Sequence, residues 1–390
     1  MKSTQSQTVL HVRVVSGAGG GPDKTILRSP RYLHDAGYDA LCAYLRSPRD
    51  AGFAQLVSQA EEQQAEIIAV DDHGPLDVRV VQRMLAVCRE RNVRIWHGHD
   101  YKSNALGVVL QRWWPMRLVT TVHGWVHHTG RTPLYYYVDR LALRRYERVL
   151  CVSRELVEQC HRHGVPRANC RLVENGIELE RFTRRQDQTA AREELQLAPT
   201  GPLIGAIGRL AKEKGFDHLL QALAQLHSQG HAVRAVILGE GPERAALERL
   251  RDQLGLQQAV LMPGHVPDVR SWLEACDLFV LSSLREAMPN VVLEAMALET
   301  PVIATRIAGV PEMLTSEDDG LIIEPAQPAA IANAVARLLN NAALRQRLVE
   351  SARETVRRRF DFASRMQKVR AIYDDLLGKE MPRPRVETSA

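Results

Sequence analysis

The chain has 390 residues, of which 45% are hydrophobic and 25% are charged. This length suits two α/β domains of about 180 residues each, and the average composition excludes a chain that is disordered throughout. The net charge of +5 is too small to indicate nucleic acid as the main partner, although it suits anionic ligands.

Cysteine usage and the N-terminus bear on the cellular compartment. The six cysteines form no Cys-x-x-Cys pair, and several fall in predicted strands or helices, where cysteine behaves as a small apolar residue. This pattern favours a reducing compartment. Residues 1–8 are polar, and no stretch reaches the ~18 apolar residues of a membrane span. We therefore expect a cytoplasmic chain without a signal peptide.

In the first half of the chain, short apolar runs alternate with amphipathic stretches. The predicted strands are residues 9–15, 39–45, 66–70, 93–96, 118–122, 149–152 and 170–173. The helices predicted between them include residues 22–36, 78–91 and 134–146. Strands that alternate with helices indicate βαβ units and a parallel sheet.

The same alternation restarts after a stretch rich in turn-forming residues, 197–202. Strands are predicted at residues 203–207, 233–238, 259–262, 278–281, 302–304 and 321–323. Helices are predicted at residues 216–228, 243–254, 269–275, 291–298 and 329–339. The sequence therefore predicts an α/β protein with two doubly wound, Rossmann-like domains.

The domain boundaries follow from where the alternation weakens. We expect an N-terminal domain over residues 1–180, a linker over 181–200 and a C-terminal domain over 201–360. A helix over 361–378 is expected to cross back to the N-terminal domain, and residues 379–390 form a tail.

Ligands of doubly wound sheets bind at the carboxyl ends of the strands, so the residues after each strand are candidates. A glycine-rich loop, residues 16–21, follows the first predicted strand, and Pro22 begins the next helix. Gly19 and Gly20 would let the backbone approach a phosphate at the helix start, while a plain strand-to-helix turn explains them equally well.

Two cations occupy the loop after strand 203–207. Arg209 and Lys214 could clamp a diphosphate, arginine through its bidentate fork and lysine as a point charge, and a solvated basic loop is the alternative. Gly239 repeats the strand–glycine–helix pattern after strand 233–238, where it shapes a nucleotide pocket or forms a structural turn.

The most informative segment, residues 285–297, follows the apolar strand 278–281. Glu286 and Glu294 stand eight residues apart, one in the loop and one in the helix. Apolar residues surround Glu294, so its carboxylate needs a partner, and the two hydroxyls of a ribose would donate to it. Pro289 and Asn290 begin the helix, whose free N–H groups can receive phosphate oxygens or sugar hydroxyls.

These motifs, in this order and each at a strand end, resemble the family-4 retaining glycosyltransferases of the GT-B fold. The resemblance covers about residues 8–375 and rests on Glu286-x7-Glu294, Gly208-Arg209 with Lys214, His123-Gly124, residues 174–177 and Gly19–Gly21. Ala287-Met288 stands where Gly-Phe is frequent in the family. The resemblance implies two domains that face a central cleft and retention of the anomeric configuration, and a front-face mechanism is our hypothesis.

The resemblance also implies roles for single residues. It assigns the catalytic site to His123, Glu286, Arg209 and Lys214. It assigns donor contacts to Gly19, Gly20, Gly239, His265, Val266, Met288, Pro289, Asn290, Val291 and Glu294. No cofactor and no metal are expected, because the chain contains no Asp-x-Asp, and cations with helix N-termini would stabilise the leaving diphosphate.

Histidines at two predicted strand ends keep alternative roles. His123 follows an apolar strand, so a hydrogen-bonded core histidine competes with a role beside the sugar and the acceptor. His99, Asp100 and Lys102 follow another strand, and we expect them to line the acceptor side. Metal binding by His97, His99 and Asp100 is the alternative.

The resemblance therefore implies a hexosyltransferase-like enzyme of polysaccharide biosynthesis. It would move a sugar from a nucleotide-diphosphate sugar to a glycan, lipopolysaccharide or lipid-linked acceptor. A GT-B-fold epimerase or phosphorylase, or a nucleotide-sugar-binding module without turnover, are the alternatives. Trp113, Trp114 and Tyr135–Tyr137 with nearby arginines indicate peripheral contact with the inner face of a membrane, against a buried helix with a solvated basic face.

Overall fold

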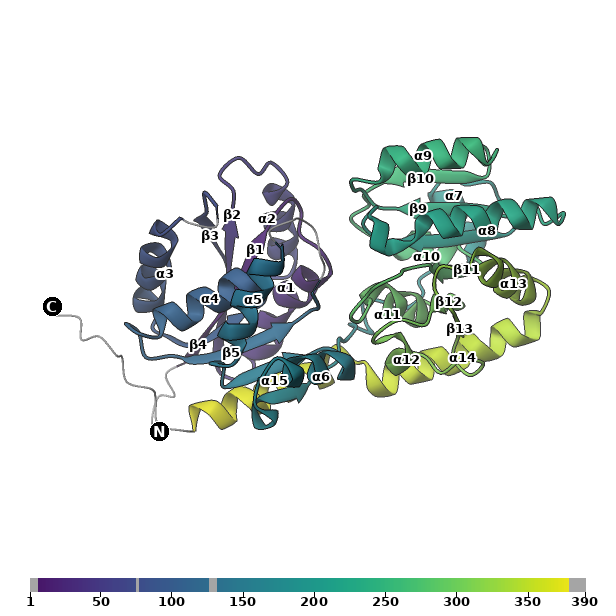
Figure 1. Ribbon diagram of the computed structural model, residues 1–390. Helices are drawn as coiled ribbons and strands as arrows, with labels where there is room; N and C mark the ends of the chain where they lie inside the picture. The colour runs from purple at the N-terminus through teal and green to yellow at the C-terminus, as the bar shows by residue number, and fades with distance from the viewer. Residues whose placement is uncertain (1–5, 75–76, 126–131, 379–390) are drawn as a thin grey trace. The chain divides into compact units, whose positions relative to one another are not determined.

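The computed structural model describes residues 6–74, 77–125 and 132–378. The expected tail, residues 379–390, lies outside the described residues. The chain divides into two compact units, the first made of residues 1–175 and 363–390 and the second of residues 176–362 (Figure 1). Each unit is described separately below.

The first unit is built on a parallel sheet. Its strands are β1 (Gln7–Val15), β2 (Tyr38–Arg46), β3 (Ile67–Asp71), β4 (Val93–Gly98), β5 (Arg117–Val122), β6 (Arg148–Cys151) and β7 (Cys170–Leu172). They lie in the order β3-β2-β1-β4-β5-β6-β7, and every described pairing is parallel. The strand order reverses between β1 and β4, which places a switch point there.

Helices cover this sheet because the connections between parallel strands must cross over it. They are α1 (Gly21–His34), α2 (Phe53–Glu62), α3 (Arg79–Glu90), α4 (Tyr101–Leu110), α5 (Thr132–Leu143), α6 (Arg154–Arg162) and the short η1 (Arg167–Asn169). Apolar strand residues such as Val9, Leu10 and Ile95 are fully buried beneath them.

The C-terminal helix α15 (Phe362–Leu377) belongs to the first unit from residue 363 onward (Figure 1). The Tyr38 hydroxyl donates to Asp374 over 2.5 Å, and Arg148 pairs with Asp375 over 2.5 Å. We expected this helix to cross back to the N-terminal domain, and these contacts are with that part of the chain.

The second unit repeats the same architecture. Its strands are β8 (Leu203–Ile207), β9 (Arg234–Leu238), β10 (Val260–Gly264), β11 (Leu278–Leu281), β12 (Val302–Thr305) and β13 (Leu321–Ile323). They lie parallel in the order β10-β9-β8-β11-β12-β13, with the switch point between β8 and β11.

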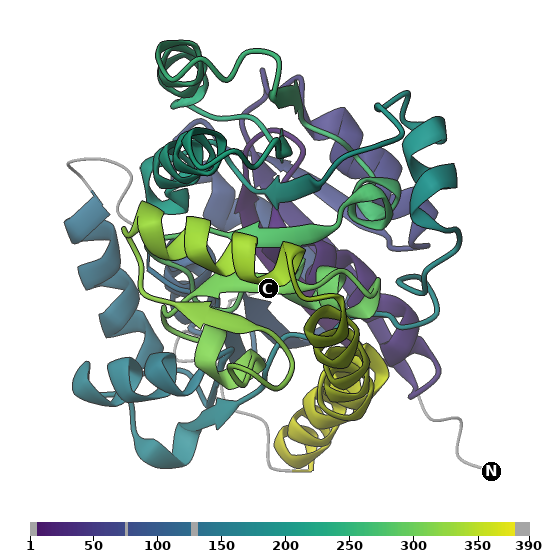
Figure 2. The same ribbon diagram turned by 90° about the vertical axis from the view of Figure 1, so that its right-hand side faces the viewer.

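The helices of the second unit surround its sheet. They are α7 (Gln188–Glu194), η2 (Lys212–Lys214), α8 (Phe216–Ser228), α9 (Arg244–Gln253), α10 (Arg270–Ala275), α11 (Asn290–Ala297), α12 (Val310–Met313), α13 (Pro328–Leu339) and α14 (Ala342–Arg359). Helices α8 and α13 pack against each other (Figures 1 and 2). Their buried leucines, alanines and Val335 join the apolar residues of the sheet in one core.

The segment 181–200, which we expected to be a linker, is part of the second unit. Its helix α7 packs against α10. The side chain of Arg192 is buried and bonds to the Asp277 carboxylate over 2.8 Å and to the Ala275 carbonyl over 3.0 Å. Contacts with residues far away in the sequence therefore join this segment to the second unit.

Candidate functional site

In the second unit, the residues expected to bind the donor meet at the switch point. Gly208, Arg209 and Lys214 follow β8, and Glu286 follows the neighbouring strand β11. The carboxyl ends of parallel strands lie at the same edge of a sheet, so this topology places the two loops side by side where doubly wound sheets bind their ligands.

Lys214 and Glu286 form an ion pair that joins these two loops, with side chains only 20% and 14% exposed. The Ser283 hydroxyl donates to the same oxygen of Glu286 over 2.9 Å. Arg209 lies further out, 48% exposed, and pairs with Glu213 over 2.5 Å. The site therefore carries two cations whose carboxylate partners an anionic ligand could displace.

The helix α11 begins at the same edge. Its first turn has no side-chain cap at Pro289, and the Val292 N–H donates to the Pro289 carbonyl over 3.1 Å. Such a helix start favours an anion or a hydroxyl oxygen. Met288, Pro289, Asn290 and Val291 lie at this helix start, and Glu294 is buried, 1% exposed, one turn further along.

Glycines let the loops at this edge approach one another closely. Gly239 has a φ of +139°, and a Cβ built on it would lie 1.9 Å from the Gly208 carbonyl oxygen. Gly264 ends β10 beside it and accepts the Gly239 N–H over 2.8 Å. His265, exposed, and the half-buried Val266 follow Gly264 at the strand end.

In the first unit, the glycine-rich loop before α1 was expected to let the backbone approach a phosphate, and the amide of one of its glycines already has a partner. Gly20 caps α1, but its N–H already donates to the Asp23 carboxylate over 2.7 Å. Asp23 is buried and pairs with Arg13 over 3.0 Å. The Gly20 amide is therefore engaged by the helix's own carboxylate, which the sequence pattern did not reveal, while Gly19 keeps a left-handed φ of +76°.

Two of the residues expected on the acceptor side have structural contacts. The Asp100 carboxylate caps α4 by accepting from Lys102 and Ser103, and it also accepts the Val14 N–H over 2.6 Å. The Lys102 ammonium bonds to both carboxylate oxygens of Asp72, over 2.6 and 2.7 Å. These contacts tie the start of α4, which follows β4, to the ends of β1 and β3.

A group of four histidines lies at the switch point of the first unit. His11 on β1 is the register partner of His97 on β4, and His99 and His123 follow β4 and β5. His11 Nδ1 lies 3.0 Å from His99 Nε2, and His99 Nδ1 lies 3.1 Å from His123 Nε2. Sequence reasoning identified His97, His99 and His123, and missed His11 because it lies in mid-strand.

Burial keeps these imidazoles neutral. Desolvation, followed by the charge of Arg365, lowers the pKa of His11 to about 3. Desolvation also lowers the pKa of His97, His99 and His123 well below the ordinary value, with repulsion from neighbouring histidines or arginines adding to it. Both nitrogens of His97 are engaged, with the Tyr373 hydroxyl at 2.5 Å and the Thr121 hydroxyl at 2.8 Å.

Among the described residues, His11, His97 and His99 offer nitrogen atoms that all lie within 4.8 Å of one another. A metal would require the in-plane lone pairs of the three rings to converge. The rings are nearly parallel, with interplanar angles of 14° to 29°. This geometry fits a hydrogen-bonded array better than a metal centre.

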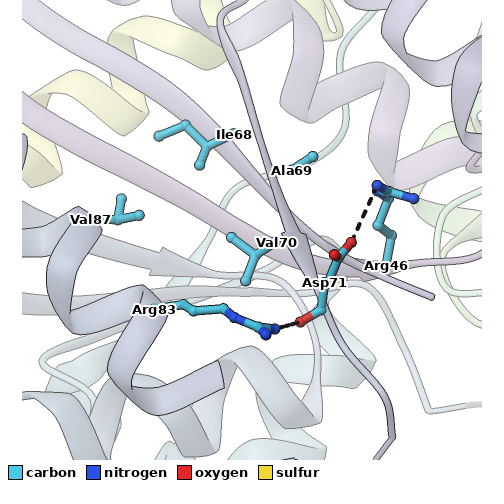
Figure 3. A pocket seen from close by; sticks show the side chains of 7 residues that line it. All are labelled: Arg46, Ile68, Ala69, Val70, Asp71, Arg83 and Val87. Carbon is cyan, nitrogen blue, oxygen red and sulfur yellow. Dashed lines mark hydrogen bonds and ion pairs between the residues drawn. The ribbon is translucent and has the colours of Figure 1, made fainter. Parts of the chain in front are cut away.

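A hollow at the edge of the first sheet is a weaker candidate (Figure 3). Its polar lining is Arg46, Asp71 and Arg83. Arg46 pairs with the Asp71 carboxylate over 3.2 Å, and Arg83 donates to the Asp71 carbonyl over 2.6 Å, as Figure 3 shows. Both guanidinium groups already bond to Asp71, which makes the hollow a weaker candidate than the β8 edge.

Comparisons with known proteins agree with the fold. Residues 187–355 match the sequence model of "Glycosyl transferases group 1", and residues 19–181 match that of "Glycosyltransferase Family 4". The chain is 28% identical over 313 residues to N-acetyl-alpha-D-glucosaminyl L-malate synthase of Bacillus anthracis, covering 79% of this chain and 82% of that protein. It is 26% identical over 316 residues to the capsular polysaccharide biosynthesis glycosyltransferase CapM of Staphylococcus aureus, covering 77% and 82%.

A solved structure with the same fold is that of Anabaena HepE in complex with UDP and glucose. The match covers 95% of this chain and 100% of the HepE chain, with a TM-score of 0.83 and 20% sequence identity. The two matched family models lie side by side along the chain, one in each half. The chain therefore belongs to the group 1 glycosyltransferases, family 4, and it is a glycosyltransferase with the GT-B fold.

Proposed function

We propose that the chain moves a sugar from a nucleoside diphosphate sugar, bound where β8 and β11 end, to a glycan, lipopolysaccharide or lipid-linked acceptor. One observation carries this proposal: Lys214 and Glu286 meet at the switch point, beside the helix α11 in which Glu294 is buried. The capsular polysaccharide role in the name of CapM supports the acceptor class. The complex of HepE with UDP and glucose makes a uridine nucleotide the first donor to test.

In the proposed reaction, the bond between the anomeric carbon and the diphosphate oxygen breaks. The acceptor hydroxyl oxygen bonds to that carbon on the same face, and its proton passes to the leaving diphosphate. Lys214 exchanges Glu286 for the diphosphate, which frees Glu286 to contact the sugar. Arg209 and the start of α11 stabilise the developing negative charge without a metal.

The remaining roles concern the nucleoside and the acceptor. Glu294 accepts hydrogen bonds from the two ribose hydroxyls. His265 and Val266 lie beside the base, and Gly239 keeps the loop after β9 close to the diphosphate. His123 of the first unit acts beside the sugar and the acceptor hydroxyl.

A thermal-shift panel of UDP, GDP, ADP and CMP with their common sugar conjugates, each with and without EDTA, tests the donor site. A donor at about 100 times its Kd should raise the free energy of unfolding by about 2.7 kcal/mol. We expect one nucleoside diphosphate to shift the wild-type midpoint equally with and without EDTA, and Glu294→Ala to lose the shift. A wild-type shift that EDTA abolishes would contradict the metal-independent site, and no shift with any nucleotide would contradict the donor site itself.

We also propose a cytoplasmic location with contact to an anionic membrane through α5. All six cysteines are free and buried, which supports a reducing compartment. No helix among the described residues has both the length and the apolar character to cross a bilayer. Leu134, Tyr137, Val138 and Leu141, spaced as one face of α5, are exposed, and Arg140, Arg144 and Arg145 lie beside them.

Of the two tryptophans considered for this contact, Trp114 is occupied within the fold, because its indole N–H donates to the Val93 carbonyl over 2.7 Å. The α5 face is therefore the part to test. We expect the wild-type chain to co-sediment with vesicles that contain anionic lipid, and Leu134→Gln with Leu141→Gln to release it. Val78→Gln, at an exposed apolar residue before α3, is the control. Equal sedimentation of both variants would contradict the proposed contact.

A further inference from the structure

Three of the four clustered histidines form a continuous chain of hydrogen bonds. His11 Nδ1 meets His99 Nε2 over 3.0 Å, and His99 Nδ1 meets His123 Nε2 over 3.1 Å. This chain of hydrogen bonds uses both nitrogens of His99. It begins in the buried centre of the sheet and ends at a half-buried side chain that follows β5.

The rings of this chain meet edge to edge. The centroids of His11 and His99 are 5.3 Å apart, and those of His99 and His123 are 5.4 Å apart, although the nearest nitrogens are much closer. His97 instead stacks on His99, with centroids 4.5 Å apart, and bonds to two hydroxyls outside the chain. The three linked rings are therefore separate from His97 in their hydrogen bonding.

A neutral imidazole carries one N–H donor and one acceptor nitrogen. Each link in the chain needs one donor and one acceptor, so the protonated nitrogen of one ring fixes that of the next. Only two neutral arrangements satisfy both links. In the first, all three rings are protonated at Nδ1, and in the second, all three are protonated at Nε2.

His11, at the buried end of the hydrogen-bond chain, decides between the two arrangements. His11 is 2% exposed, and its Nε2 has no hydrogen-bond partner among the described residues. Buried N–H groups without a hydrogen-bond partner are rarer in proteins than buried acceptors without one, so Nε2 of His11 carries the lone pair and Nδ1 carries the proton.

We propose that His11 and His99 are positioning residues that hold His123 in the Nδ1–H form, so that its Nδ1 can only donate a hydrogen bond. The use of that donor rests on the proposed function, in which His123 acts beside the sugar and the acceptor hydroxyl. In this form His123 donates to an oxygen of the substrate and does not remove the proton of the acceptor.

Nitrogen NMR of protein labelled with ¹⁵N in its histidine rings tests the tautomer without any substrate. Two-bond ¹H–¹⁵N correlations distinguish protonated from unprotonated ring nitrogens, and His123→Gln identifies the His123 signals by their loss. In the wild-type protein we expect Nδ1 of His123 to be protonated and Nε2 to be unprotonated. Protonated Nε2 in the wild-type spectrum would overturn the proposal, whether or not any variant folds.

His11→Phe keeps a ring in the core but removes the buried end of the hydrogen-bond chain. We expect both His123 nitrogens to shift toward the averaged values of a ring that exchanges between its tautomers. Tyr373→Phe removes a hydrogen bond from His97 in the same cluster and is the matched control, with no expected shift at His123. An unchanged His123 spectrum in folded His11→Phe would overturn the positioning role.

Turnover separates this inference from the proposed function. We expect His11→Phe to lower kcat at least tenfold with an unchanged KM for the donor, and Tyr373→Phe to keep both. If the spectra follow the prediction while His11→Phe keeps wild-type turnover, the tautomer assignment stands and the role of His123 in transfer is contradicted.

Discussion

The two cations after β8, Arg209 and Lys214, each form an ion pair with a carboxylate, and a diphosphate would have to compete with these carboxylates. Lys214 is 20% exposed and pairs with Glu286, while Arg209 is more exposed and pairs with Glu213. The Arg209–Glu213 pair is the more exposed of the two, so an anionic diphosphate can compete for Arg209 at a modest free-energy cost. The pairing therefore keeps the cations in place without removing them from the ligand.

We predict that Lys214→Ala lowers kcat by a factor of ~10²–10³, because loss of one charge-stabilising group in a preorganised site typically costs this much. Lys212→Ala, at an exposed lysine of the same η2 turn, is the matched control and should keep wild-type turnover. Steady-state kinetics with the donor identified by thermal shift measure both. Equal turnover of the two variants would rule out Lys214 as a diphosphate ligand.

The buried histidines predict a pH dependence of stability. Folding lowers the pKa of His11 from 6.5 to about 3, so between these values the unfolded chain binds more protons than the folded one. The contribution of such a group is fully present above pH 6.5 and falls by about 1.4 kcal/mol per pH unit below it, down to the folded pKa. Asp100 and Asp139, whose pKa is raised by desolvation, act in the opposite direction.

A comparison of wild type with His11→Phe isolates one histidine from these opposing groups. We expect the free energy of unfolding of the wild type, relative to that of His11→Phe, to fall as the pH falls from 6.5 to 4.5, because only the wild type loses the contribution of His11. Denaturant unfolding at several pH values measures it. Parallel pH profiles for the two proteins would show that His11 is not held neutral by the fold.

At the scale of secondary-structure elements, the loops after β8 and β9 depend on close backbone contact. Gly208 donates its N–H to the Leu238 carbonyl over 2.9 Å, and Leu210 donates to Glu240 over 2.9 Å. Gly239 lies between these two links with no space for a side chain. The loop that carries Arg209 is therefore held by its neighbour and not by its own sequence.

We predict that Gly239→Ala lowers the free energy of unfolding by about 2–4 kcal/mol, since both its φ and the Gly208 carbonyl oppose a Cβ. Gly230→Ala is the matched control, because Gly230 also has a positive φ, +85°, but open space around it. It should cost only about 1 kcal/mol. Chemical denaturation compares them, and equal losses would mean that the Gly208 contact does not constrain Gly239.

At the scale of the whole molecule, the two units differ in how the chain builds them. The second unit is continuous, residues 176–362, whereas the first needs both the N-terminal segment and the C-terminal helix. The chain passes from one unit to the other twice, after residue 175 and after residue 362. The segments next to these two points are hydrogen-bonded, since the Ile177 N–H donates to the Phe360 carbonyl over 2.8 Å and the Phe362 N–H donates to the Ile177 carbonyl over 3.0 Å. The second unit thus has its own sheet and core within one stretch of chain.

We predict that residues 176–362, expressed alone, fold and bind the donor nucleotide, because Arg209, Lys214, Glu286 and Glu294 all lie within them. Circular dichroism reports the fold, and calorimetry with the nucleoside diphosphate reports binding. Glu294→Ala in the same fragment is the control for binding at the proposed ribose contact. A folded fragment without affinity would mean that the nucleotide needs residues of the first unit.

The sequence by itself determined the α/β class, the two Rossmann-like halves and the family. Local signals suffice for these conclusions, because strands buried on both faces are continuous apolar runs and donor motifs directly follow them. It also indicated Glu294, since a carboxylate among apolar residues is conspicuous in any helix. The departures came where a segment had no local signal, such as α7, which is joined to the second unit by contacts with distant residues such as Asp277.

Only the tertiary structure decided which side chains meet. Asp23 engages the Gly20 amide, Asp100 caps α4, and Lys102 bonds to Asp72. His11 lies in the middle of a strand, and only the parallel register of β1 and β4 brings it to His97 and His99. Contacts between distant residues depend on strand order and register, which arise from the packing of the whole sheet and leave no mark on the neighbouring sequence.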